Sequence, residues 1–130
     1  MAIKVSSSTV IDDNKIFLPN NSAEVSAAAT ISAGALALNL NTAAVFTVAL
    51  NANITSITLS NIQASGRVSS FVLIFTADGT ARSVTWPASF HWPTGTAPTL
   101  TSSNGKEDVF AFFTVDGGTN WQAFISGQNL

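Results

Sequence analysis

The chain has 130 residues, of which 46% are hydrophobic and only 9% are charged, and it carries a net charge of −2 without any cysteine. The absence of cysteine excludes a disulfide framework and a cysteine-based metal site. The five basic residues are scattered, so there is no basic stripe for nucleic acid, and the high hydrophobic fraction argues against a disordered chain.

The low charge is the most unusual feature of the composition, because ordinary globular chains have roughly 25% charged residues. No charged residue lies between Glu24 and Arg67, where serine, threonine and asparagine supply the polar surface. So weakly charged a surface is poorly protected against association. We therefore expect partners to cover much of it. The alternative is a self-contained β-domain with a serine- and threonine-rich surface.

Nothing in the sequence predicts export or membrane insertion. The first ten residues contain one lysine and no apolar core of the kind found in secretory signals. The longest strongly apolar run, residues 71–75, is far shorter than the roughly 20 residues that span a bilayer. We expect a soluble protein of one domain, with no membrane partner.

The first 29 residues differ from the rest and are expected to form an extended N-terminal arm. Polar stretches alternate there with small apolar clusters, which predicts one or two short strands. Residues 23–29 hold the one candidate for a helical turn. Because apolar side chains avoid water, Ile16, Phe17 and Leu18 are predicted to contact the body of the domain or a neighbouring chain.

From residue 30 onward, apolar and polar side chains alternate with period two, which predicts half-buried strands. The apolar positions of the first three runs are Leu36, Leu38, Leu40, Phe46, Val48, Leu50, Ile57 and Leu59. Residues 51–53 and 61–66 are predicted to form the turns between these strands. Residues 30–130 are accordingly expected to form one β-sandwich domain.

The next predicted strand, residues 68–76, is apolar on both faces in its second half. Its apolar residues divide between the two faces, with Phe71, Leu73 and Phe75 on one and Val72 and Ile74 on the other. Such a strand is central in its sheet, or another chain covers its outer side. The turn sequence at residues 78–79 then predicts a hairpin in which residues 82–86 return as a strand.

Residues 87–106 are predicted to form a long loop, because Pro87 and Pro93 lack the N–H donors that a central strand needs. The last hairpin is the clearest. Residues 108–115 and 119–126 flank a glycine-rich turn and carry a high aromatic content. Short strands with frequent turns and no convincing helical period predict an all-β fold, a β-sandwich or jelly-roll-like barrel.

No group of residues points to catalysis. The single histidine, His91, excludes a two-histidine metal site, and no serine occupies a Gly-x-Ser-x-Gly elbow. Adjacent carboxylates such as Asp12 and Asp13 point to opposite faces of a strand, whereas Asp78 and Asp116 belong to turns. We therefore predict a protein that is not an enzyme and that binds no metal or cofactor.

The three tryptophans allow two interpretations. Exposed tryptophans beside polar groups stack on sugars, in which case Trp92 and the neighbouring His91 would contact a glycan or receptor. In the other interpretation, Trp86 and Trp121 fill the core and Trp92 fixes the loop. The sequence favours the core interpretation and leaves the glycan interpretation open.

Three segments carry a resemblance to a known group of proteins. They are residues 84–100 (VTWPASFHWPTGTAPTL), 108–121 (DVFAFFTVDGGTNW) and 124–128 (FISGQ). Together they resemble a module of phage tail-fibre and related virion proteins that often stands at a C-terminal end. The resemblance is strongest over residues 68–130. It implies a β-rich structural module of a virion with no catalytic role, and it carries no functional residue across.

A chain of this length has no fibre shaft, because one such domain spans only about 40 Å. We expect the arm to attach it to a larger particle, as in a capsid decoration (cement) protein; a tail-fibre or tail-tip component is the alternative. The expected partners are capsid or tail subunits and further copies of the chain, a trimer by analogy with the family. The expected location is the virion exterior, after synthesis in the host cytoplasm. Glycan binding stays open as a further function.

Overall fold

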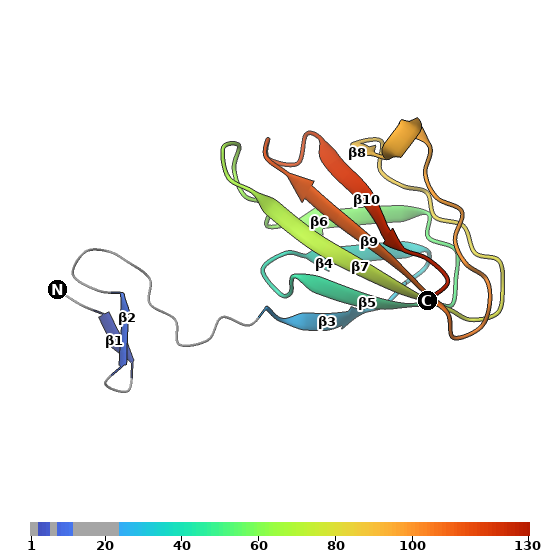
Figure 1. Ribbon diagram of the computed structural model, residues 1–130, viewed down its shortest axis with the longest axis horizontal. Coiled ribbons are helices and arrows are strands. Elements are labelled where there is room, and N and C mark those ends of the chain that lie inside the picture. Colours follow the sequence, from blue (N-terminus) through green and yellow to red (C-terminus); the bar gives the residue numbers. More distant parts are fainter. Residues whose placement is uncertain (1–2, 6–7, 12–23) are drawn as a thin grey trace.

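The computed structural model describes residues 3–5, 8–11 and 24–130. Apart from one 3-10 turn (η1, Pro93–Gly95), the regular secondary structure of these residues consists of strands. The prediction of an all-β fold is therefore confirmed. The main body contains a six-stranded sheet and a two-stranded sheet, and the two-stranded sheet lies behind the larger one in Figure 1.

The N-terminal region contains a short antiparallel hairpin of β1 (Ile3–Val5) and β2 (Ser8–Ile11), in agreement with the short strands expected there. Residues 12–23, and with them the predicted contact residues Ile16, Phe17 and Leu18, lie outside the described residues. The next strand, β3 (Ser26–Ala29), belongs to the six-stranded sheet. The expected arm of residues 1–29 therefore extends four residues too far, and no helical turn forms at residues 26–29.

Between β3 and β7 the chain winds back and forth between the two sheets. β5 (Val45–Leu50) and β7 (Ser69–Ala77) follow β3 in the large sheet, whereas β4 (Ala35–Asn39) and β6 (Ser56–Ser60) form the small one. Every neighbouring pair among these five strands is parallel. Parallel neighbours need a crossover, and here a strand of the opposite sheet provides it. The winding is that of a short parallel β-solenoid.

Tight turns make this winding possible. Ala33 (φ 50°) and Gly34 (φ 79°) form a two-residue turn, and the backbone groups of Ser32 and Ala35 exchange hydrogen bonds of 2.9 Å across it. A Cβ atom on Gly34 would lie 2.7 Å from Oγ1 of Thr55, in the turn of the following coil. Glycine is therefore required at this position both for the positive φ and for the close stacking of successive turns.

The C-terminal half of the large sheet is mainly antiparallel. β7 pairs with β9 (Glu107–Thr114), which pairs with β10 (Trp121–Gly127), so the last predicted hairpin is confirmed. The short strand β8 (Phe90–His91) adds to β10 in parallel. The returning strand predicted at residues 82–86 is wrong, because β9 occupies the edge of β7 over eight paired positions. Only an isolated bridge joins Val84 to Ile54.

The core lies between the two sheets and beneath the loop of residues 86–100. Alternate positions of β4, β5, β7 and β9 are buried, which confirms the period-two prediction for these strands. The largest buried side chains include Leu36, Leu38, Phe75, Phe110, Phe112 and Trp121. Phe71 is central among the aromatic rings: its centroid lies 4.7 Å from that of Phe112 and 5.3 Å from that of Trp121.

Because half of the large sheet is parallel, the structure does not confirm the finer prediction of a β-sandwich or jelly-roll-like barrel. Immunoglobulin-type sandwiches and jelly rolls are antiparallel, whereas three of the five neighbouring pairs in this sheet are parallel, namely β3–β5, β5–β7 and β8–β10. The period-two pattern is the same in either case, because side chains alternate across a strand whatever the direction of its neighbour.

Candidate functional site

The six-stranded sheet has an inner face, which packs on the core, and an outer face, which no other layer of the described chain covers (Figure 1). We use "outer face" for the side chains that alternate with the buried ones. They are Ser26, Ala28, Val45, Thr47, Ala49, Ser70, Val72, Ile74, Thr76, Glu107, Val109, Ala111, Phe113, Gln122 and Phe124. Sheets whose second side faces water normally carry polar side chains there. On this face the middle strands carry valine, isoleucine, alanine and phenylalanine in addition to Thr47, Ser70 and Thr76.

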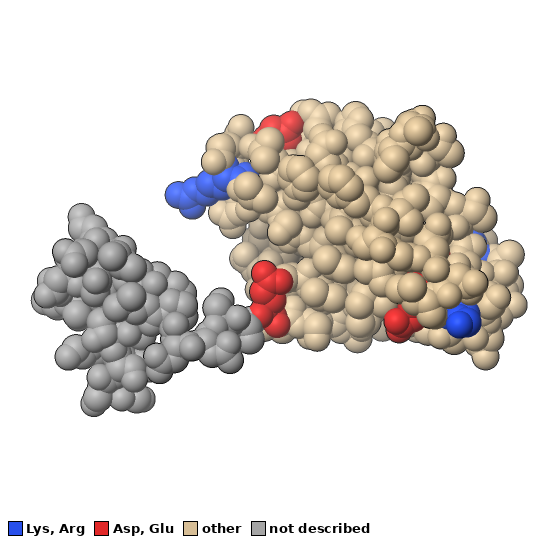
Figure 2. All heavy atoms as spheres, viewed as in Figure 1, with Lys and Arg blue, Asp and Glu red and all other residues tan. Residues whose placement is uncertain are grey.

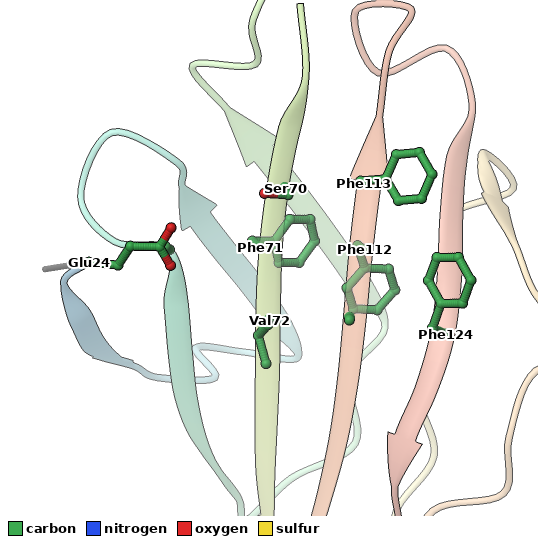
Figure 3. A pocket seen from close by; sticks show the side chains of 9 residues that line it. Glu24, Ser70, Phe71, Val72, Phe112, Phe113 and Phe124 are labelled. Carbon is green, nitrogen blue, oxygen red and sulfur yellow. The ribbon is translucent and has the colours of Figure 1, made fainter. Parts of the chain in front are cut away.

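Two aromatic rings stand at one end of the outer face. Phe113 of β9 and Phe124 of β10 stack with their centroids 5.8 Å apart and their planes 13° apart. They are 36% and 46% exposed, respectively, although phenylalanine is normally among the most buried residues. Figure 3 shows both rings on neighbouring strands, with Ser70 and Val72 on β7 beside them. Two exposed rings side by side form an apolar patch of the kind that interaction surfaces often contain.

A shallow pocket continues from these rings across β7 toward the start of β3. Its walls include Ser70, Val72, Ala111 and Phe124, and Glu24 stands at its far end (Figure 3). The pocket has a volume of about 220 Å³. Pockets for small ligands usually enclose about 300–1,000 Å³. The hollow is therefore the size of one or two inserted side chains, which suits a protein partner better than a substrate.

Charged side chains stand at the margin of the outer face and not at its centre. Glu24 lies two residues before β3, and Glu107 is the first residue of β9. Figure 2 shows acidic and basic side chains at the margins of a broad uncharged expanse. A partner that covered the centre of this face would leave every charged side chain at its rim in contact with water. The cost of desolvating a buried ion is therefore avoided.

Trp92, one of the two residues predicted to contact a glycan, is buried. Trp92 is only 8% exposed, and its ring packs edge-on against those of Trp86 and Phe110. It therefore offers almost no free ring surface to a sugar in this structure. Its Nε1 is buried without a hydrogen-bond partner. Trp121 is fully buried and Trp86 is half-buried, as in the core interpretation of the tryptophans.

His91 is exposed and belongs to a chain of polar contacts along the turn between β9 and β10. Its Nε2 lies 2.9 Å from Oδ1 of Asn120, whose Nδ2 donates to Oδ2 of Asp116 at 2.8 Å. Asp116 also accepts hydrogen bonds from the backbone N–H of Asn120 and the hydroxyl of Thr114. These bonds, those from Asn120 above all, lower the pKa of Asp116 to about 2. The contacts fix a turn and bring no nucleophile to the histidine.

A second carboxylate, Asp108, is buried at the other end of β9. It accepts hydrogen bonds from the backbone N–H and the hydroxyl of Thr101, both at 2.7 Å, and from the backbone N–H of Asn129 at 3.1 Å. Burial raises its pKa, but the combined hydrogen bonds from Thr101, Asn129 and Gln128 outweigh this effect, so the pKa lies below its ordinary value. Asp108 thus fastens the loop before β9 and the C-terminal tail to the sheet.

The part of the chain that the structure describes contains no group of three or more potential metal-ligating side chains. Within the same residues there is no helix of the length and apolarity needed to cross a bilayer. A comparison of the chain with protein-family models finds no match, and comparisons with curated proteins and with solved structures likewise find none.

Sequence reasoning missed the stacked rings of the outer face, although it noted the aromatic content of the last hairpin. The adjacent pair Phe112 and Phe113 contained the decisive signal, because consecutive residues of a strand point to opposite faces. If Phe112 is buried, Phe113 must face outward. Phe124 pairs with Ala111, so it shares the outward face with Phe113.

Proposed function

We propose that the chain is a non-enzymatic structural subunit of a phage virion, on the exterior of the particle, and that neighbouring subunits cover its outer face. The observation that carries the proposal is the outer face, whose centre is uncharged and largely apolar, with the exposed stacked rings of Phe113 and Phe124. The resemblance of residues 68–130 to a module of tail-fibre and related virion proteins supports the virion as the setting.

The energetics of the outer face favour association. Burial of an apolar side chain stabilises a complex by roughly 25 cal/mol per Å² removed from water. The central strands contribute Val72, Ile74 and Ala111 to such a contact in addition to the two rings. Because the charges stand at the rim, this gain is not offset by ion desolvation.

Within the virion, a capsid decoration (cement) protein is our first assignment. In this proposal the two packed sheets act as one sandwich-like block, and the segment before Glu24 attaches the block to capsid subunits. The described domain begins at Glu24, which lines the outer-face pocket, so the point at which the attachment segment joins the block lies beside the apolar face. One surface can then contact both the capsid and further copies of the chain.

Electron microscopy of the intact particle tests this assignment, with the chain located by an antibody or a fused tag at Leu130, which is exposed. We expect density tiled over the capsid surface, with the outer face against a neighbouring subunit. Density confined to the tail would overturn the cement assignment and leave a virion protein of the tail. Absence of the chain from purified particles would overturn the virion proposal altogether.

A further inference from the structure

We propose that the free edge of β3 pairs with β3 of a second copy of the chain, antiparallel about a two-fold axis, so that two six-stranded sheets become one continuous sheet. This contact runs along the edge of the sheet. It is separate from the outer face on which the proposed function rests.

The two edges of the large sheet differ in how they are protected. At one end stands β8, which is two residues long, with Pro87 before it and Pro93 after it. Short strands and prolines are common means of blocking an edge against pairing. At the other end stands β3, which has four residues, no charge, no proline and no bulge in its pairing with β5.

The backbone of β3 presents hydrogen-bonding groups at this edge that no described strand uses. The carbonyl of Val25 accepts a hydrogen bond from the N–H of Ala44, so Val25 points toward β5. The N–H and C=O groups of one residue point to the same side of a strand, and those of the next residue point to the other. Ser26 and Ala28 therefore direct their N–H and C=O groups away from β5, where no strand of the described chain pairs with them.

Both sheets are open at the same end of the molecule. β3 and β4 are the first strands of the winding, so each is the edge strand of its own sheet there. A groove runs between them, lined by Ala27, Ala29, Ala35 and Ala37 with Phe46 behind. A two-fold axis perpendicular to the sheets would place β3 beside β3 and β4 beside β4 of the second copy. One operation would thus close both edges and the groove.

The charges permit this pairing. In a two-fold antiparallel pair, residues whose N–H and C=O groups point to the partner must lie opposite one another, so the axis passes through a residue and not between two. The two central residues of β3, Ala27 and Ala28, are the positions that pair most of the strand. Glu24 then faces Thr30 or Ser32 of the second copy, which are uncharged. No like charges meet, and the same four residues serve on both sides. This self-complementarity is why we assign the edge to a second copy and not to another protein.

The test separates the edge contact from the outer face by using the Phe124→Lys background, in which a charge disables face-to-face association. In that background, size-exclusion chromatography with light scattering should give twice the chain mass of 13.5 kDa. Adding Ala28→Pro, which deletes an edge N–H but no hydrogen bond to β5, should halve the mass. Ala28→Thr, which keeps the N–H, should leave it unchanged. A monomer before Ala28→Pro is added would overturn the proposal.

Amide hydrogen exchange at Ala28 supplies a readout that does not depend on a variant's folding. In the Phe124→Lys protein we expect the Ala28 N–H to be protected at high concentration and to lose that protection on dilution. Protection that is independent of concentration would mean that the chain's own N-terminal segment covers the edge. If the Ala28 N–H exchanges at the rate of an unpaired edge at every concentration, then neither a second copy nor the N-terminal segment covers β3. Either result would contradict pairing with a second copy.

Discussion

The two faces of the six-stranded sheet have similar chemistry but different surroundings. On the inner face, Phe71, Phe112 and Trp121 pack against one another and against the second sheet. On the outer face, Phe113 and Phe124 stack on each other and remain in contact with water. Folding of one chain completes only the inner face. Substitutions there should change the free energy of folding, whereas those on the outer face should change association.

The largest expected difference is between Phe71→Ala and Phe124→Ala. Phe71 is 2% exposed and is surrounded by four aromatic rings, so its truncation should lower the free energy of unfolding by about 3–5 kcal/mol. Phe124 is half in solvent, and its truncation should cost less than about 1 kcal/mol. Urea denaturation of dilute protein measures both. Equal losses would show that the two faces are not distinct.

Asp108→Ala and Glu107→Ala extend the comparison to neighbouring carboxylates of β9. Asp108 is buried on the inner side, and its loss leaves the N–H groups of Thr101 and Asn129 without their acceptor. We expect a loss of about 2–4 kcal/mol in the free energy of unfolding. Glu107 is exposed, and its replacement should change the value by no more than about 0.5 kcal/mol. The reverse order would contradict the role assigned to Asp108.

The turn that leads into the second sheet gives a smaller effect. In Gly34→Ala the new Cβ meets Oγ1 of Thr55 and the residue keeps a positive φ, so we expect a loss of about 1–3 kcal/mol. Gly66→Ala is the matched control, because Gly66 also has a positive φ but open space around it. Thermal unfolding should place Gly34→Ala below Gly66→Ala. The same melting temperature for both would mean that close stacking of the turns contributes nothing.

The smallest effect concerns pH at the margin of the sheet. The pKa of Asp116 is lowered from 3.8 to about 2, so its contribution to stability is present above pH 3.8 and is lost as the pH falls through about 2. Asp116→Asn should lower the melting temperature at pH 7, and the difference from the parent should shrink between pH 4 and pH 2. Melting curves that stay equally separated down to pH 2 would contradict this linkage.

Much of the fold could be predicted from the sequence. Period-two alternation located Leu36 and Leu38 on the core side, and the glycine-rich turn located the last hairpin, because both signals are local. The parallel winding could not be predicted in this way. Alternation is the same for parallel and antiparallel neighbours, and the choice between them depends on whether the turn at Gly34 leads back into the same sheet or across to the other.

The location of the candidate site could not be predicted from the sequence. The scarcity of charge predicted a surface covered by partners, because charge is counted without knowing the fold, and that expectation stays a prediction. The location of that surface depends on the register between β9 and β10, which sets Phe124 opposite Ala111 and so beside Phe113. For Trp92, in contrast, the sequence drew attention to a residue that the fold buries. It was the most prominent residue of a loop, yet the loop folds inward and buries its ring between Trp86 and Phe110.

Light scattering of the purified 130-residue chain, with and without Phe124→Lys, tests the central claim most directly. We expect the parent to form an oligomer whose mass falls toward smaller species on dilution. The variant should have a smaller mass at equal concentration and an unchanged melting temperature when both are dilute. A parent that stays monomeric at high concentration, or a variant with the same mass as the parent, would contradict the claim that neighbours cover the outer face.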